Sequence, residues 1–226
     1  MASTDIEKLE HGKTGSGKVA CTPSTDDVSL DWRAELPVLE GRRVVMREPR
    51  KSDAAALFTV LSSKPVSRFI TPPPRTVDAF EKYITWAQEQ RAGGHYVCFA
   101  IFMRNSDTPI GMIHVRALAP GFGSADWGFA LATEFWGSGI FGEAAELVLD
   151  FTFDVLKTHR LEARAAVRNA RGNAAMKKLG ASQEGTLRQS FFLNGDYLDQ
   201  AIWSLLREDW KKRQRSKAAW ESRVVH

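Results

Sequence analysis

Long apolar runs are missing from this chain of 226 residues, and no segment approaches the roughly 18 residues that a membrane-spanning helix needs. The first ten residues include acidic side chains and no apolar core, so we expect no secretory signal there. Only two cysteines occur, Cys21 and Cys98, and they lie far apart in unlike contexts. This pattern favours a reducing, cytoplasmic location and gives no metal-binding signature.

The chain also lacks the features of a nucleic-acid-binding surface, and it shows no internal repeat. Its formal net charge is only +4, and part of that excess lies in the segment 211–217. No basic strand is interleaved with aromatic residues, so the basic segment is typical of a solvated face and no nucleic-acid partner is expected. The remaining composition, 43% hydrophobic and 26% charged, indicates a globular chain with one sizeable core.

Composition along the chain predicts three regions. Residues 1–35 are rich in Gly, Ser, Thr, Lys and Asp without a sustained period, which predicts a flexible N-terminal extension. Residues 36–210 have the dense apolar pattern of the folded domain, and residues 211–226 form a basic C-terminal tail. Within the extension, residues 12–18 match the start of a phosphate-binding loop, but Val19 replaces the Ser or Thr that would hold magnesium. We therefore expect no ATP binding from this segment.

Apolar periodicity and turn residues predict the elements of the domain. Helices are expected at 54–61, from about 76 to 92, from the glycine turn described below to about 155, and at 173–179. Asn194-Gly195 is a strong hairpin signal between the last two strands. The expected strands are 43–47, 96–103, 109–117, 125–132, 161–167, 185–193 and 198–205.

A glycine-rich turn between a predicted strand and a predicted helix is the strongest functional signal. Gly137, Gly139 and Gly142 fall within six residues and leave little side-chain bulk over the start of the helix. Backbone N–H groups there can approach a phosphate, and the helix dipole favours negative charge. The turn therefore predicts a pyrophosphate site.

The order of the elements decides which pyrophosphate is expected. A dinucleotide-binding domain alternates strand and helix, and its glycine turn follows the first strand. Here the turn follows a run of antiparallel strands and precedes a single crossover. This order predicts a mixed sheet, which is a poor match to a dinucleotide fold.

Over about residues 36–210, the chain resembles the GNAT superfamily of acetyl-coenzyme A-dependent N-acetyltransferases, and within it the RimJ/RimL-type branch. The resemblance implies an α/β (α+β) fold, with a mixed, mostly antiparallel twisted sheet of about seven strands and helices on both faces. Any one of the matching motifs is weak, but their order and spacing are specific. The residues that carry the resemblance are 46–49 with Asp53, 126–129, 135–139 with Glu143 and Ala144, 159–163, Asn169, 178–180, 184–185 and 194–197.

The resemblance also implies the donor site. In that family the glycine turn holds the pyrophosphate of coenzyme A, and the preceding strand splays from its neighbour and binds the pantetheine arm through its backbone. Acetyl-CoA is thus the expected co-substrate, and no metal is expected. The residues expected to bind it are Phe129, Ala130, Leu131, Trp136, Gly137, Ser138, Gly139, Ile140, Phe141 and Gly142, with Asn169 and Asn173 as hydrogen-bonding partners of the pantetheine.

Transfer to an amine needs proximity, a donor to the thioester carbonyl, and groups that take up and supply protons. The candidate catalytic residues are Asp126 at the start of the strand leading to the turn, Tyr197 in the final hairpin, and His114 on an apolar strand. Each also has a structural interpretation. Asp126 can be a solvent-facing strand end, Tyr197 a packing residue of the hairpin, and His114 a structural histidine with its hydrogen bonds made within the fold. Cys98 is expected in the core rather than as a nucleophile that carries the acyl group.

Four positions depart from the family pattern. A small residue is expected at Phe141, and Gly172 and Met176 occupy the positions where relatives place a serine or a tyrosine acid. Phe191 aligns with the position of the carboxylate base. The predicted function is direct acetyl transfer from acetyl-CoA to a primary amine, and the alternative is a non-catalytic acyl-CoA-binding or regulatory module.

The acceptor side is predicted from two segments. The loop 63–75, with three consecutive prolines, and the hairpin at Asn194 are expected to form its walls. The acceptor is then either the N-terminal amine of a protein or peptide, or a small amine such as an amino acid, a polyamine or an antibiotic. The sequence leaves both classes open, together with a homodimeric assembly.

Overall fold

The computed structural model describes residues 31–224, and Asp31 onward forms one compact unit. Residues 12–18, with their loop-like pattern, and most of the expected extension lie outside the described residues. Within the part described, no helix is long and apolar enough to cross a membrane.

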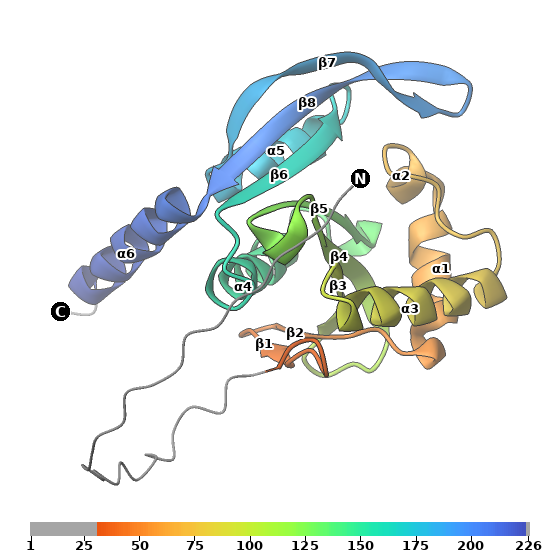
Figure 1. Cartoon of the computed structure of the whole chain (residues 1–226), viewed down its shortest axis with the longest axis horizontal. Helices are drawn as coiled ribbons and strands as arrows, with labels where there is room; N and C mark the ends of the chain where they lie inside the picture. Colours follow the sequence, from red (N-terminus) through yellow and green to blue (C-terminus); the bar gives the residue numbers. More distant parts are fainter. Residues whose placement is uncertain (1–30, 225–226) are drawn as a thin grey trace, which may run out of the picture. The chain divides into compact units, whose positions relative to one another are not determined.

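Eight strands form one sheet in the order β1-β2-β3-β4-β5-β6-β8-β7 (Figure 1). All neighbouring strands are antiparallel except β5 and β6, which are parallel. The predicted mixed, mostly antiparallel sheet is confirmed, and the strand beyond the seven expected is the two-residue β1. The strands are β1 Leu39–Glu40, β2 Val44–Arg47, β3 Tyr96–Met103, β4 Pro109–Ala117, β5 Ser124–Leu131, β6 Arg160–Ala166, β7 Ser182–Leu193 and β8 Asp196–Leu206.

Helices cover both faces of the sheet, as predicted (Figure 1). One apolar cluster joins the sheet to α4 and α5, and a second joins the opposite face to α1 and α3. Strand β3 contributes to both clusters because alternate residues of a strand point to opposite faces. The α-helices are α1 Ala54–Ser62, α2 Lys64–Ser67, α3 Val77–Ala92, α4 Ile140–Asp154, α5 Ala170–Leu179 and α6 Arg207–Val224, and short 3-10 turns lie at Lys51–Asp53 (η1), Pro120–Phe122 (η2) and Thr133–Phe135 (η3).

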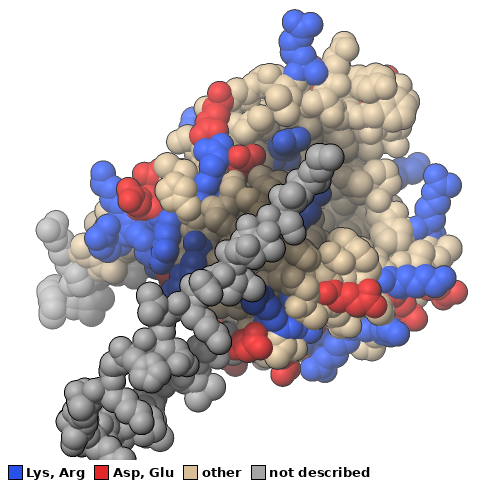
Figure 2. Space-filling view, viewed as in Figure 1, with Lys and Arg blue, Asp and Glu red and all other residues tan. Residues whose placement is uncertain are grey.

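The basic C-terminal segment lies in helix α6, which is anchored to α4. Trp210 is fully buried and donates its indole N–H to Asp150 at 2.8 Å. Lys211 and Lys217 pair with Asp154 and Glu146 of α4. Figure 2 shows Lys and Arg side chains gathered over this part of the molecule, with carboxylates among them. The basic residues therefore complement the acidic surface of α4.

The parallel pair β5–β6 is the part of the sheet that creates a site. Its register contains only three pairs and ends at Asp126 and Glu162. Strand β5 continues to Leu131 and β6 to Ala166, so neither strand pairs with the other beyond this point. The two strands therefore splay, and the splay opens towards the glycine turn that follows β5.

Candidate functional site

The glycine turn has the backbone geometry that its sequence predicts. Gly137 and Gly139 adopt φ values of 76° and 82°, which L-residues with side chains rarely adopt. Helix α4 then begins at Ile140. The Ser138 hydroxyl donates to the Phe135 carbonyl at 2.6 Å and accepts from the Ile140 N–H at 3.3 Å. The turn is thus held by its own residues at the positive end of a 15-residue helix.

Space over this turn is open enough for an anionic group. A Cβ atom added at Gly137 or Gly142 would meet no atom within 4 Å. At Gly139 the nearest atom is a guanidinium nitrogen of Arg43, at 3.2 Å. Open space, helix N–H groups and a nearby cation together fit a pyrophosphate.

Arg43 is fixed beside the turn by Glu143 of α4. Its Nε donates to Glu143 Oε2 at 2.9 Å, and its Nη1 donates to the Ser138 carbonyl at 3.0 Å. The Glu143 carboxylate also accepts from the Arg43 N–H at 2.6 Å. Burial acts to raise the pKa of Glu143, but hydrogen bonds from Arg43 and the Val44 N–H outweigh it and lower the pKa below its ordinary value. The pair stays ionised and holds the Arg43 guanidinium at the turn.

A second arginine reaches the turn from the other side of the splay. The Arg171 guanidinium, in the first turn of α5, lies 3.9 Å from the ring centroid of Trp136, in a cation–π contact. The Trp136 indole donates to the Leu131 carbonyl at 2.8 Å. Trp136 therefore connects the end of β5 to the helix that follows β6, and cations flank the glycine turn on both sides.

The backbone of β5 alternates between its two neighbours. Ala132 donates to Ile110 of β4 at 2.8 Å, and Leu118 donates to Ser124 at 2.8 Å, so even-numbered residues of β5 direct their backbone groups to β4. Ala130 belongs to this set and pairs with Met112. Phe129 and Leu131 direct theirs to the splay, so a backbone contact with a ligand is expected of these two residues and not of Ala130.

Phe141 packs on β5, the strand that precedes the turn. Its ring centroid lies 4.2 Å from that of Phe129 in β5, with the planes tilted by 36°. The residue is partly buried against the cluster that joins the sheet to α4. The large side chain at a position where a small one is expected is thus accommodated by an aromatic contact between β5 and α4.

Asn169 and Asn173 both make structural hydrogen bonds. Asn169 caps α5, because its Oδ1 accepts from the Gly172 N–H at 3.0 Å. Asn173 donates to the carbonyls of Ala166 and Asn169 at 3.0 and 2.8 Å. Its Oδ1 accepts from the Trp203 indole at 2.8 Å. The two amides connect β6, α5 and β8, so contacts between either of them and pantetheine remain predictions.

The two departures from the family pattern in α5 have structural reasons. A Cβ atom at Gly172 would lie 2.6 Å from Asn169 Nδ2, so the asparagine cap occupies the space of a serine side chain. Met176 is 1% exposed in the core and contributes no acid. Phe191 lies in β7 opposite Leu198. The positions in α5 are therefore filled by a capping group and a core side chain, and nothing in the structure explains the phenylalanine at 191.

Asp126 is paired with an arginine on the neighbouring strand. Its two carboxylate oxygens accept from Arg116 at 3.0 and 2.7 Å. Hydrogen bonds and charge attraction from this carboxylate raise the pKa of Arg116. Both oxygens of Asp126 are thus engaged by one guanidinium, which fixes the orientation of the carboxylate.

His114 lies close to Asp126, on the face of β4 that packs against α3. Its imidazole stacks on Tyr96 with centroids 5.3 Å apart, and it occupies the space beside Gly128, where a Cβ would lie 2.6 Å from Cε1. Burial lowers the pKa of His114 to about 4, with the Asp126 charge acting in the opposite direction. The ring is therefore neutral at pH 7. Because its pKa is low, it is also a weak base.

Tyr197 and Cys98 lie in contrasting environments. Tyr197 is 66% exposed near the tip of the β7–β8 hairpin, and its ring lies 4.9 Å from that of Phe192. Cys98 is buried in β3, and burial raises the pKa of its thiol to about 12. The thiol stays protonated at neutral pH, as expected of a core cysteine. The structure thus places His114 near Asp126 and places Tyr197 on a separate hairpin.

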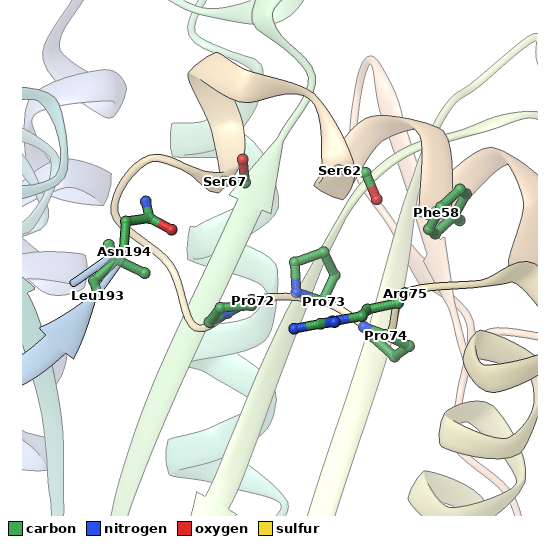
Figure 3. Close-up of a pocket in the computed structure, with 9 residues that line it drawn as sticks. All are labelled: Phe58, Ser62, Ser67, Pro72, Pro73, Pro74, Arg75, Leu193 and Asn194. Atoms are coloured by element: carbon green, nitrogen blue, oxygen red, sulfur yellow. The ribbon is translucent and has the colours of Figure 1, made fainter.

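A cavity of about 330 Å³ lies where the sequence predicts the acceptor side. The proline loop and the β7–β8 hairpin supply opposite parts of its lining (Figure 3). Helices α1 and α2 complete it, and α2 was not predicted within this loop. The lining consists of Phe58, Ser62, Ser67, Pro72, Pro73, Pro74, Arg75, Leu193 and Asn194. Because the hairpin belongs to the β6–β8 part of the sheet and α1 packs on β4 and β5, the cavity spans the splayed halves.

Sequence reasoning missed Arg43, Arg171 and Arg75. Arg43 precedes β2 and lies far along the chain from the glycine turn. Arg171 follows β6, on the other side of the splay. No local motif identifies them. Arg75 follows the three prolines that were predicted to wall the acceptor side, and its position there was the available signal. Among the described residues, no group of His, Cys, Asp and Glu could hold a metal ion.

Comparison with known proteins gives a consistent result. The model of a family described as an acetyltransferase (GNAT) domain matches residues 43–182. The uncharacterized N-acetyltransferase YoaA of Bacillus subtilis (strain 168) is 27% identical over 177 residues, which cover 76% of this chain and 98% of the relative. The spermidine N(1)-acetyltransferase of Escherichia coli (strain K12) is 34% identical over 73 residues, 32% of this chain and 39% of that protein.

Solved structures show the same fold. Mycobacterium smegmatis RimJ in complex with CoA-disulfide matches with a TM-score of 0.66 and 21% identity, covering 73% of this chain and 82% of that one. At this identity, the match concerns the fold alone.

Proposed function

This chain belongs to the acetyltransferase (GNAT) family and is an N-acetyltransferase, and we propose that it takes its acetyl group from acetyl-CoA, bound along the splay of β5 and β6. The proposal rests chiefly on the open space over Gly137 and Gly142 at the start of α4. The structure of Mycobacterium smegmatis RimJ is a complex with CoA-disulfide, which supports the same donor.

Each part of the donor has a matching part of the chain. The N–H groups at the start of α4 bind the pyrophosphate, and Arg43 and Arg171 supply positive charge on the two sides of the turn. The backbone of Phe129 and the N–H of Leu131, which face the splay, hydrogen-bond the pantetheine arm. A backbone N–H of this strand also stabilises negative charge on the thioester oxygen during the transfer.

The chain contributes to the reaction mainly by positioning. The amine nitrogen forms a bond to the acetyl carbon, the carbon–sulfur bond breaks, and the sulfur leaves as a thiolate that takes up a proton. Holding the amine and the thioester together at the splay converts an encounter in solution into a step within one complex. A fixed backbone donor adds to this effect without reorganisation of the protein.

We propose that the amine loses its proton to solvent rather than to a side chain. Asp126 is held by Arg116, and the low pKa of His114 makes it a weak base. Tyr197 is exposed on the hairpin. The three residues remain candidates, and their substitution distinguishes these interpretations. The acceptor amine enters the cavity between the proline loop and the β7–β8 hairpin.

Gly142 offers a test of the donor site that preserves the fold. It is the third residue of α4, where a glutamate is favourable to the helix, and its side-chain direction is open. Gly142→Glu adds a negative charge beside the pyrophosphate, and Gly142→Gln adds a side chain of the same size without charge. We expect CoA to bind at least about tenfold more weakly to the Glu variant than to the Gln variant, through charge repulsion.

Isothermal titration with CoA and the release of free thiol from acetyl-CoA across an amine panel are the two measurements. Equal CoA affinity in the two variants would place the pyrophosphate elsewhere. CoA binding without thiol release on any amine would contradict acetyl transfer by this site.

A further inference from the structure

The cavity between the proline loop and the hairpin contains one ionisable side chain, Arg75. The rest of its lining is apolar or neutral: prolines, serines, Phe58, Leu193 and Asn194. The carboxylates closest in sequence to the lining, Asp78 and Asp196, are not part of it. The cavity is therefore a small, mostly uncharged space with a single positive charge.

Arg75 has no partner among the described residues. It is exposed, and it forms no hydrogen bond or ion pair with any residue that the structure describes. This distinguishes it from Arg43, Arg116 and Arg171, which contact Glu143, Asp126 and Trp136. In Figure 3 the Arg75 side chain extends back along the proline run, and its nitrogens are drawn below Pro73, between Pro72 and Pro74.

The backbone on both sides of Arg75 is restrained. Pro72, Pro73 and Pro74 precede it, and each proline ring fixes its own φ angle. Thr76 follows and caps α3, its hydroxyl accepting from the Ala79 N–H at 3.1 Å. The backbone that carries Arg75 is thus stiff, so a ligand that binds the guanidinium has little backbone to order.

We propose that the acceptor is a small amine that also carries a carboxylate, and that Arg75 binds this carboxylate. A guanidinium presents paired N–H donors that match the two oxygens of a carboxylate. The cavity volume of about 330 Å³ is at the lower end for small-molecule sites, so it suits a molecule of amino-acid size. This inference rests on the proposed function, because it assumes that the cavity receives the acceptor.

The same features disfavour a polyamine. A polyamine carries several positive charges, and Arg75 would repel them while no carboxylate of the lining attracts them. The similarity to the spermidine N(1)-acetyltransferase covers only 32% of this chain, so it does not determine the lining of this cavity. Specificity would then come from repulsion of polycations as well as from attraction of an anion.

The first experiment compares matched acceptors with the wild-type protein at saturating acetyl-CoA. The pairs are leucine with leucinamide and 6-aminohexanoate with hexylamine, and spermidine is the polycation. The two carboxylates place the charge at different distances from the amine. We expect at least one carboxylate to exceed its uncharged partner about tenfold in kcat/KM, mainly through KM, and spermidine to be the poorest substrate.

Variants assign the effect to Arg75. Arg75→Gln should remove the preference for the carboxylate, mainly by raising KM for 6-aminohexanoate. Arg75→Glu should reverse the order, so that spermidine becomes better than 6-aminohexanoate. Arg68→Gln is the matched control, because Arg68 lies in the same loop outside the lining and contacts Phe69. It should leave the preference unchanged.

A binding measurement tests carboxylate recognition by Arg75 without relying on acetyl transfer. Hexanoate and hexanol lack the amine, and we expect hexanoate to bind the CoA-loaded protein more tightly and to lose this advantage in Arg75→Gln. Equal binding of the two, or an unchanged carboxylate preference in Arg75→Gln, would overturn the role of Arg75. In that case, acetylation of any amine in the panel would still support the proposed transferase function. Failure of CoA binding or of thiol release would instead count against the proposed function itself.

Discussion

His114 provides the most direct test of how the structure treats a predicted catalytic residue. Burial lowers its pKa from the ordinary value of 6.5 to about 4. The unfolded chain therefore binds a proton between these pH values that the folded chain does not. The free energy of unfolding is unaffected by this group above pH 6.5 and falls as the pH decreases towards 4. At roughly 1.4 kcal/mol per pKa unit, the loss amounts to at most about 3 kcal/mol.

The perturbation is His114→Asn, which removes the titration and keeps a neutral polar side chain. At pH 7 the variant should be less stable by about 1 kcal/mol, because the stacking of the imidazole on Tyr96 is lost. Towards pH 4 the difference should shrink or reverse, since only the wild-type protein retains the unfavourable site. Urea unfolding at several pH values measures both effects. His95→Asn, at an exposed histidine in the turn before β3, is the control substitution.

The same variant separates a structural from a catalytic role. A general base contributes about 100-fold or more to the rate, whereas a structural histidine should leave kcat at pH 7 within about fivefold. Two results would refute the reasoning: unfolding curves whose pH dependence is the same in variant and wild type, or an NMR titration of His114 with a pKa at or above 6.

Two further predictions concern positions that depart from the family pattern. Phe141→Ala removes the ring that packs on Phe129 and should lower the free energy of unfolding by about 2 kcal/mol, while CoA affinity measured by calorimetry stays within about twofold. A large loss of affinity would show that the ring belongs to the site. Gly172→Ser should cost about 1 kcal/mol by displacing the Asn169 cap, and this cost should be smaller in an Asn169→Ala background. Equal costs in both backgrounds would contradict the proposed clash.

Local patterns were sufficient for the central sheet. Strands β3 and β4 have the predicted bounds because apolar runs end there at Gly, Pro, Asn and Asp residues. The final hairpin was identified by Asn194-Gly195, whose φ values of 53° and 92° match the turn that the pair favours. Where one short segment contains both the strand and its turn, the sequence alone determines the element.

The features that the sequence did not reveal depend on contacts between residues far apart in the chain. Helix α6 was interpreted as a basic tail from residue 211 because its charges suggest a solvated segment, yet buried Trp210 and ion pairs with α4 hold the helix. The glycine turn was predicted, whereas its flanking Arg43 and Arg171 come from separate segments. The cavity walls were predicted as segments, but the charge of the lining depends on which side chains turn inward.

The departures from the family pattern bear on chemistry as well as on packing. Met176 is buried in the core, and the space at Gly172 is filled by the Asn169 cap, so neither position retains a vacancy for an acid. The transferase activity must then depend on features that these substitutions leave intact. Those features are the open turn at α4, the splay-facing backbone of β5 and the cavity that spans the splay. All three position substrates, and positioning is a large source of rate for a reaction between an amine and a thioester.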